Sequence, residues 1–448
     1  MMLQGQATTT DLRPCKNGQY RTLMAILGGA LALLILTTIP LTFPLLNYSL
    51  LLLKTSLESP AAAASAAFRP QIFASGNLSI LSALPCDLAI GDWIPNSNPN
   101  AALPYTNDTC WAIHDHLNCF KYGRPDAGFL RWRWRPEGCE LPAFNPAQFL
   151  ELMRHKAFAF VGDNIARNHV QSLICLLSKL EYPIDVSPSR DEHFKKWKYM
   201  SYNFTMAFLW TTHLVKSKES TTGGVFNLYL DEFDEAWTSQ IAGFDYVMIS
   251  SGQWFLHPMF FYENGKVIGC HDCFLNNVTE LGIYHGYRKA FRTAFKAILS
   301  SDSYKGITYL RTFSPAHFEN GLWNQGGNCL RTEPFKSKDS ALEGMNLELY
   351  MTQMEEFRRA EREGRKNGFK LRLLDTTQAM WLRPDGHPSK YGHWPQGNVS
   401  LYNDCVHWCL PGPIDIWSDF LLHMLKMEGI RSAQERVQFA HQTELNQR

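Results

Sequence analysis

Two patterns of hydrophobic and polar positions alternate along the chain after residue 150. Short apolar runs predict strands at residues 157–161, 225–230, 245–250, 307–311 and 370–375. Longer stretches with an apolar face predict helices at residues 165–180, 286–299, 341–366 and 415–427. The alternation predicts an α/β fold, a three-layer sandwich in which helices cover both faces of a mostly parallel sheet.

The turn after the first predicted strand combines three unusual residues. Gly162 permits a tight turn, and Asp163 or Asn164 can cap the following helix, whose first N–H groups are placed to hold an anion. Gly252 and the segment 311–317 also follow predicted strands. Parallel strands carry their ligand crevice at their carboxyl ends, so we expect all these residues around one crevice.

The beginning of the chain predicts a membrane anchor. No charged residue occurs from residue 23 to residue 53, and residues 23–46 alone are long enough to cross a ~30 Å hydrocarbon layer. A cleaved signal peptide is the alternative, but the stretch is longer and starts later than such peptides do. Basic residues precede it, so we expect residues 1–22 to form a cytosolic tail and the rest to be lumenal, in a single-pass type II arrangement.

Composition divides the lumenal part into four segments. Residues 47–84 are rich in Ala, Ser and Pro and predict a stalk. Residues 85–140 hold four cysteines and several tryptophans and predict a small disulfide-rich N-terminal domain, while residues 141–430 carry the α/β pattern. Residues 431–448 are polar, as expected of a solvated helix or a disordered tail.

The charge balance and the cysteine content limit the classes of partner and the cellular compartments that suit this chain. Lys and Arg total 43 and Asp and Glu total 42, so no basic field favours nucleic acid. Aromatic residues make up 13%, which suits a carbohydrate-binding surface, although a large core uses them as well. Beyond Cys15 an even set of cysteines suits disulfides in an oxidising compartment. Glycosylation sequons, which also require the lumen, occur at Asn77, Asn107, Asn203, Asn277 and Asn398.

Asp404 and His407 are the candidate catalytic pair. Acyl transfer by a hydroxyl nucleophile needs a base within hydrogen-bond reach and a carboxylate that orients the imidazole, and a three-residue spacing lets one loop present both. Cys405, His407 and Cys409, with or without the Cys-His-Asp-Cys segment at residues 270–273, are also residue types that bind zinc. In an oxidising lumen we expect disulfides there instead, and we predict no metal.

Together these stretches resemble a known family. The Gly162-Asp163-Asn164 turn, the block Asp404-Cys405-Val406-His407-Trp408-Cys409 and the cysteine-rich segment 110–136 resemble the plant trichome birefringence-like family of polysaccharide O-acetyltransferases, which has a GDSL/SGNH-like fold. The resemblance covers about residues 85–426. In that family the third residue of the Gly-Asp-Ser signature is the nucleophilic serine, and Asn164 stands in its place here. The resemblance assigns the base role to His407 and the orienting role to Asp404.

The resemblance also implies contacts with the oxyanion or the substrate. These fall to Asp163, Gly252, Arg167, Arg311 and His317, although Gly252 is equally explained as a turn glycine and Arg167 as a brace. Residues 311–319 and 323–329 are expected to line the acceptor cleft, and residues 383–388 to form a shaped turn or a substrate contact.

Disulfide pairings follow from the resemblance as well. It implies that Cys270 and Cys273 pair locally or remain thiols, while the other pairs are Cys86 with Cys139, Cys110 with Cys175, Cys119 with Cys409, and Cys329 with Cys405. Two of these bonds would tie the His407 loop to distant parts of the chain.

The function implied by the resemblance is that of a Golgi-lumenal O-acetyltransferase acting on sugar hydroxyls of a hemicellulose, of the xylan or xyloglucan class. It implies a polysaccharide acceptor, the Golgi membrane bound through residues 23–46, other wall-synthesis enzymes as partners, and an acetyl donor, with an acetyl-CoA-derived one as the candidate, but no permanently bound cofactor. An amide is not a nucleophile, so Asn164 leaves direct transfer, with His407 as base on the sugar hydroxyl. Two other hypotheses stay open: a catalytically silent protein that binds glycan or a partner enzyme, and a hydrolase that uses water as acceptor.

Overall fold

The computed structural model describes residues 86–96, 102–220, 224–273, 275, 277–394 and 402–446. The predicted cytosolic tail, the anchor at residues 23–46 and the stalk lie outside the described residues. Within the described part, no helix combines the length and the apolar character that crossing a bilayer requires. The sequons Asn77 and Asn398 also lie outside it, and the exposed ones are Asn107, Asn203 and Asn277.

A seven-stranded sheet forms the centre of the fold, in the order β13-β12-β9-β3-β6-β5-β4. The first five strands in this order run parallel, and the last two continue the sheet in antiparallel fashion. Four of the predicted strands are confirmed here as β3, β9, β12 and β13. The bounds are β3 (Ala157–Gly162), β4 (Ile184–Asp185), β5 (Phe194–Tyr199), β6 (Phe204–Trp210), β9 (Tyr246–Ser250), β12 (Ile307–Arg311) and β13 (Lys370–Leu374).

The four predicted helices are confirmed as α3, α5, α6 and α8. The last of these runs well beyond its predicted end, so the polar tail from residue 431 is helical through residue 446. The bounds are α2 (Pro146–Leu152), α3 (Asn164–Leu177), α4 (Glu235–Thr238), α5 (Ile283–Leu299), α6 (Gly344–Lys366), α7 (Thr377–Trp381) and α8 (Ile416–Asn446).

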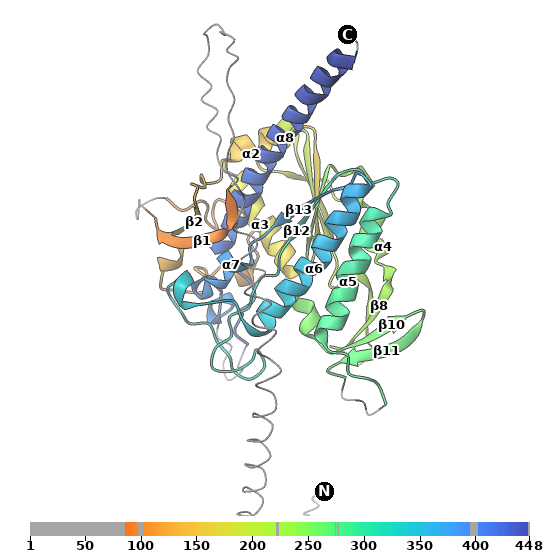
Figure 1. The fold of residues 1–448 in the computed structure, drawn as a ribbon. Coiled ribbons are helices and arrows are strands. Elements are labelled where there is room, and N and C mark those ends of the chain that lie inside the picture. The colour runs from red at the N-terminus through yellow and green to blue at the C-terminus, as the bar shows by residue number, and fades with distance from the viewer. Residues whose placement is uncertain are drawn as a thin grey trace, which may run out of the picture. The chain divides into compact units, whose positions relative to one another are not determined.

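Alternate residues of the central strands face two separate cores. In β3, Phe158 and Phe160 pack with residues of α2, α3 and α8, whereas Ala159 and Val161 pack with residues of α5 and α6. Figure 1 shows α5 and α6 on one side of the sheet and α3 and α8 on the other. A strand buried on both faces is apolar throughout, which is why the sequence shows it as a continuous apolar run.

The predicted strand at residues 225–230 belongs to a second sheet, which corrects the expectation of one sheet. It is β8 (Phe226–Phe233), and its sheet has the order β11-β10-β8-β7. In β8 the buried residues alternate with partly exposed ones, as in a sheet with one face toward solvent. That alternation is the sequence signal that separates β8 from the central strands. Its neighbours are β7 (Val215–Glu219), β10 (Met259–Glu263) and β11 (Lys266–His271).

The cysteine-rich segment shares the main core. β1 (Asp87–Pro95) and β2 (Trp132–Glu137) form an antiparallel pair. Leu88 and Trp134 belong to the same buried cluster as the residues of α3 and α8, and the Trp93 indole donates to the carbonyl of Ala379 at 2.7 Å. This segment is therefore stabilised by contacts with the α/β body as well as by its disulfides.

The described residues contain five disulfides. Four are the pairs that the resemblance implies, and these are confirmed; Cys270 and Cys273 pair with each other. Cys405 and Cys409 bond to Cys329 and Cys119, respectively. Neither cysteine is then available as a thiolate ligand, so the zinc alternative at this block is wrong.

His169 is an unusual member of the core. It lies on α3 with no exposed surface, its ring edge to face between the rings of Phe160 and Trp417 at centroid distances of 5.3 Å each. Neither of its ring nitrogens has a hydrogen-bond partner. Burial, with a smaller contribution from the Arg311 charge, lowers the pKa of His169 to about 3.

We predict that His169→Phe stabilises the fold, and more so in acid. Unfolding exposes His169 to water, where it binds a proton below its ordinary pKa of about 6.5, whereas the folded chain resists that proton down to about 3. The stability contributed by the neutral ring is therefore lost as pH falls below 6.5. The gain in the free energy of unfolding should be about 2 kcal/mol larger at pH 5 than at pH 7.5. Urea unfolding at both pH values measures it, and an equal gain at both would contradict the prediction.

Candidate active site

The end of β3 and the end of β9 are joined through Asp163. Its Oδ1 accepts a hydrogen bond from the Ile165 N–H, which caps α3, and its Oδ2 accepts one from the Gly252 N–H, both at 3.0 Å. Gly162 must be glycine, because a Cβ there would lie 1.8 Å from the Ser250 carbonyl oxygen. Asp163, rather than Asn164, is thus the helix cap. Burial raises the pKa of Asp163, against the opposing charge of Arg311.

Asn164 is the first residue of α3 and is partly exposed. Its side chain makes no hydrogen bond with another described residue. One turn along the same face of the helix, Asn168 is buried and pairs with both backbone groups of Trp408. Its Oδ1 accepts from the Trp408 N–H at 2.8 Å, and its Nδ2 donates to the Trp408 carbonyl at 3.3 Å. The segment that carries His407 is therefore fixed against the first turns of α3.

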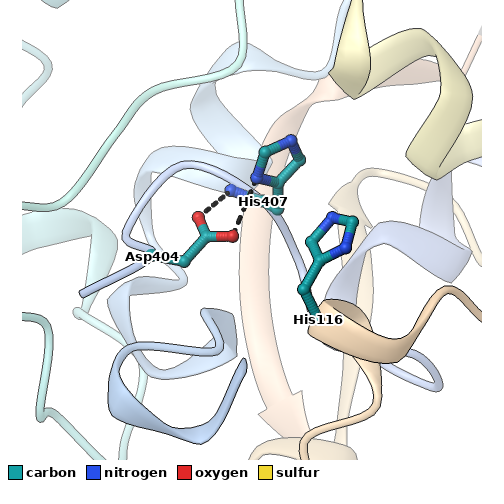
Figure 2. Close-up of side chains that lie close together, drawn as sticks. All are labelled: His116, Asp404 and His407. Carbon is teal, nitrogen blue, oxygen red and sulfur yellow. Dashed lines mark hydrogen bonds and ion pairs between the residues drawn. The ribbon is translucent and has the colours of Figure 1, made fainter. Parts of the chain in front are cut away.

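Asp404 and His407 form a hydrogen-bonded dyad. The His407 Nδ1–H donates to Asp404 Oδ2 at 2.8 Å, and Asp404 Oδ1 accepts from the backbone N–H groups of Val406 and His407 at 3.1 and 2.9 Å. Figure 2 shows both bonds to the carboxylate and the opposite ring edge turned away from it. His407 Nε2 has no hydrogen-bond partner among the described residues, so it is the atom available for proton transfer.

The two members of the dyad move each other's pKa in opposite directions. Burial alone would raise the pKa of Asp404, but the charge of His407 and the three hydrogen bonds outweigh it and hold this pKa well below its usual value. Burial alone would lower the pKa of His407, but the Asp404 carboxylate outweighs it and raises that pKa. The charge of Asp163 also raises the pKa of His407 and that of Arg167 lowers it, so charged residues at the start of α3 influence the dyad.

Two further histidines lie beside the dyad and escaped the sequence analysis. The His116 ring meets the His407 ring edge to face at 5.3 Å (Figure 2). The His114 ring lies 5.9 Å from that of His116. His116 lies three residues before Cys119, and His407 lies two residues before Cys409, so the disulfide between those cysteines brings the two imidazoles together. The implied pairing of the cysteines was the signal that could have found His116.

Arg167 lies at the wall of a cavity of about 280 Å³. Its guanidinium lies over the Trp210 ring at 4.6 Å, and the cavity is also lined by Trp111, His114 and Glu192. Aromatic and charged side chains around one small cavity are suited to a sugar ring with its hydroxyl groups. Arg167 thus faces space where a substrate can enter.

Three residues expected at the substrate lie in the interior. The Gly252 N–H already donates to Asp163, as described above. Arg311 is 2% exposed and donates from Nε to Ser250 Oγ at 2.9 Å, with its guanidinium over the Trp417 ring. His317 is 6% exposed and bonds to other buried groups. These groups, like the buried Asp163, thus bond to strand-end and loop atoms in the interior, and a contact of any of them with a substrate stays a prediction.

The two segments expected to line the acceptor cleft differ in exposure: 311–319 is mostly buried, whereas residues 323–326 of the second segment are exposed. Trp323 and Tyr402 are 53% and 64% exposed and meet edge to face at 5.4 Å, so the segment 323–329 does reach the surface near the dyad loop. In the segment 383–388, Arg383 and Asp385 form a buried ion pair at 2.8 Å. That segment is a shaped turn rather than a substrate contact.

A cation has one candidate position at this site. Donor atoms of His116, Asp404 and His407 lie within 4.8 Å of one another. His407 offers such an ion its Nε2, since its Nδ1–H is bonded to Asp404. The groups near the Cys270–Cys273 disulfide offer no thiolate.

Comparison with known proteins agrees with this geometry. Residues 141–424 match the family described as "GDSL/SGNH-like Acyl-Esterase family found in Pmr5 and Cas1p", and residues 84–140 match the "PMR5 N terminal Domain". Protein trichome birefringence-like 19 of Arabidopsis thaliana is 54% identical over 422 residues, covering 93% of this chain and 95% of the relative. The chain belongs to the trichome birefringence-like family.

Other members of the trichome birefringence-like family carry a name that states an activity. Xyloglucan O-acetyltransferase 4 of Populus trichocarpa is 44% identical over 346 residues, covering 76% of this chain and 81% of the relative. Xyloglucan O-acetyltransferase 2 of Arabidopsis thaliana is 40% identical over 348 residues, covering 76% of this chain and 83% of the relative. Asn164 stands at the first position of α3, where the resemblance places a nucleophilic serine.

We predict that Asn168→Ala weakens the fold, whereas Asn164→Ala does not. Loss of the Asn168 amide leaves the N–H and the carbonyl of Trp408 buried without partners, which should lower the free energy of unfolding by about 2–4 kcal/mol. Asn164, the matched control one turn earlier, should change it by less than about 0.5 kcal/mol. Urea unfolding of both variants measures the difference, and equal effects would show that Asn168 does not fix the dyad loop.

Proposed function

We propose that this chain is an O-acetyltransferase of a cell-wall hemicellulose in which His407 acts directly on the acceptor hydroxyl. The observation that carries the proposal is the His407 imidazole, oriented by Asp404 through a 2.8 Å hydrogen bond and with its Nε2 unpaired within the described part of the chain. A base prepared in this way is the part of acyl transfer that does not require a serine.

The proposed transfer proceeds in one displacement. His407 Nε2 takes the proton of a sugar hydroxyl, and the sugar oxygen forms a bond to the carbonyl carbon of the acetyl donor. The bond from that carbon to the donor's leaving group breaks, and the leaving group takes the proton from His407. No acyl-enzyme forms, since the Asn164 amide is not a nucleophile; its NH₂ group can instead donate to the developing oxyanion.

The acceptor that we propose is xyloglucan or xylan. The names of the relatives support xyloglucan, and the aromatic side chains at the surface near the dyad suit a polysaccharide chain. The acetyl donor that we propose is acetyl-CoA-derived. We further propose a Golgi location with residues 23–46 as a single-pass anchor and other wall-synthesis enzymes as partners, on the strength of that uncharged stretch and of the disulfides.

The second candidate is a protein that binds glycan or a partner enzyme without catalysis. Asn164 favours it, because removal of the nucleophile from a Ser-His-Asp triad typically lowers the rate by ~10⁴ to 10⁶. The same residue weighs against a hydrolase that uses water as acceptor, which also would rely on the missing serine. We rank direct transfer first because the dyad keeps its hydrogen bond and its raised His407 pKa.

We predict that the parent chain transfers acetyl to xyloglucan or xylan oligosaccharides and that His407→Ala lowers the rate at least about 100-fold, through loss of the general base. Mass spectrometry of the oligosaccharides after incubation with an acetyl donor measures both. His423→Ala, which removes a histidine on α8 outside the site, is the control and should keep the parent's rate.

Asn164→Ser separates the two candidate functions. Activity that appears only in Asn164→Ser would refute direct transfer and support the silent binder. Binding of the same oligosaccharides, measured by calorimetry, then decides between a glycan-binding role and a role toward a partner protein.

A further inference from the structure

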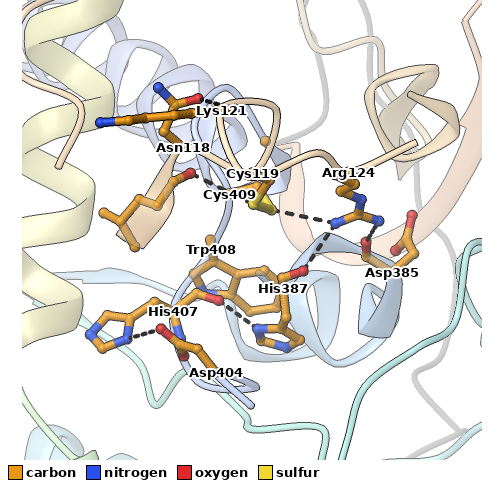
Figure 3. Close-up of a disulfide and its surroundings, with 12 residues drawn as sticks. Asn118, Cys119, Lys121, Arg124, Asp385, His387, Asp404, His407, Trp408 and Cys409 are labelled. Atoms are coloured by element: carbon orange, nitrogen blue, oxygen red, sulfur yellow. Dashed lines mark hydrogen bonds and ion pairs between the residues drawn. A yellow bond between two sulfur atoms is a disulfide. The ribbon is translucent and has the colours of Figure 1, made fainter. Parts of the chain in front are cut away.

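A chain of hydrogen bonds runs behind the dyad through two buried histidines. His317 Nε2 lies 2.9 Å from the Trp381 carbonyl oxygen, and His317 Nδ1 lies 2.7 Å from His387 Nε2. His387 Nδ1 lies 2.6 Å from the carbonyl oxygen of His407. Figure 3 shows this last bond, with the His387 ring beneath the loop that carries the dyad.

The three contacts require three protons. Each carbonyl oxygen can only accept, so His317 Nε2 and His387 Nδ1 must both carry hydrogen. The contact between the two rings also needs one proton, because two bare nitrogen lone pairs at 2.7 Å repel each other. Two neutral imidazoles together hold only two protons. All three contacts are hydrogen bonds only when the two rings together carry a third proton, which gives the pair one positive charge.

The surroundings of the pair oppose and also balance this charge. His317 and His387 are 6% and 1% exposed, and burial lowers the pKa of both, that of His317 to about 4, whereas the proton that the 2.7 Å contact between the rings requires acts in the opposite direction. The His387 ring stacks on Trp408 at 4.0 Å, which covers one face of the ring. The charged or titratable groups that face the pair are Arg124, Glu319, Arg331, Asp385, Asp404 and His407.

Asp404 supplies a balancing negative charge on the His387 side. Arg331 pairs with Glu319, Arg383 with Asp385 and Arg124 with Asp126, so these groups largely cancel. The Asp404 carboxylate raises the pKa of His387, whereas the His407 charge lowers it. A positive histidine pair therefore neutralises Asp404 when His407 itself is neutral, which is the state in which His407 can accept a proton.

We propose that His317 and His387 share one extra proton, and that this cationic pair positions His407 through its backbone carbonyl. His317 and His387 are positioning residues: they do not touch a substrate, and they act on the loop that holds the base. When the pair loses its extra proton, at least one of the three contacts must open, and His407 loses a fixed position or a balancing charge. The proton count stands whether or not the chain transfers acetyl; only its consequence for catalysis rests on the proposed function.

Nuclear magnetic resonance of the full chain with ¹⁵N-labelled histidine tests the proton count. Long-range proton–nitrogen correlations report which ring nitrogens carry hydrogen. We expect His317 Nε2 and His387 Nδ1 both to be protonated at pH 6.5, together with one strongly low-field proton between the rings. One proton on each ring, over the whole pH range in which the chain stays folded, would overturn the proposal.

Two conservative variants assign the signal and keep the outer bonds. His387→Asn retains an N–H donor toward the His407 carbonyl, and His317→Gln retains one toward the Trp381 carbonyl. Each should remove the low-field signal, and His387→Asn should raise the pKa of His407, because a positive neighbour is lost. His169→Phe, which removes a buried histidine without a partner, is the matched control and should leave the low-field signal in place. An unchanged His407 pKa in His387→Asn would refute the positioning role even if the shared proton were seen.

Discussion

The site depends on one side-chain amide that pairs with a distant peptide unit. Asn168 gives Trp408 the donor and the acceptor that a neighbouring strand would give, across 240 residues of sequence. The amide belongs to α3, and the cap of this helix, Asp163, bonds to Gly252 just after β9. The central sheet therefore sets the position of the His407 imidazole. A disulfide, a two-residue bridge between Ser389 and Asp404, and the Gly386 carbonyl hold the same loop from other sides. Base and carboxylate thus meet α3 as one rigid unit.

The sequence predicts the layers of the fold well because their physical cause is local. Runs such as Phe158 to Val161 are apolar since both faces are covered, and the helices between them show one apolar face. The dyad was predictable because Asp404 and His407 are only three positions apart, so that one loop presents both. The second sheet was not predicted, although the sequence carries two signals of a half-exposed hairpin sheet. One is the alternation in β8, and the other is the turn between β10 and β11, where Asn264 and Gly265 both have a positive φ.

The burial of particular polar residues could not be predicted, because the sequence does not state which polar groups find partners in the interior. Arg311, His317 and Arg383 are of types usually found at surfaces or at substrates, yet each has its partners in the interior, where the structure needs donors for strand-end and loop carbonyls. His116 illustrates the converse, since nothing in its immediate neighbourhood marks it. Its place beside His407 follows from a bond between cysteines 290 residues apart. Contacts of that kind are properties of the whole topology.

That same bond between Cys119 and Cys409 has a consequence for how the molecule is made. Cys119 leaves the ribosome long before its partner, with most of the sheet still to be synthesised. Its thiol must stay reduced, or be held in a bond that is later exchanged, until almost the entire polypeptide has been translated. The covalent bond that brings the two imidazoles together can therefore close only after most of the sheet has been synthesised.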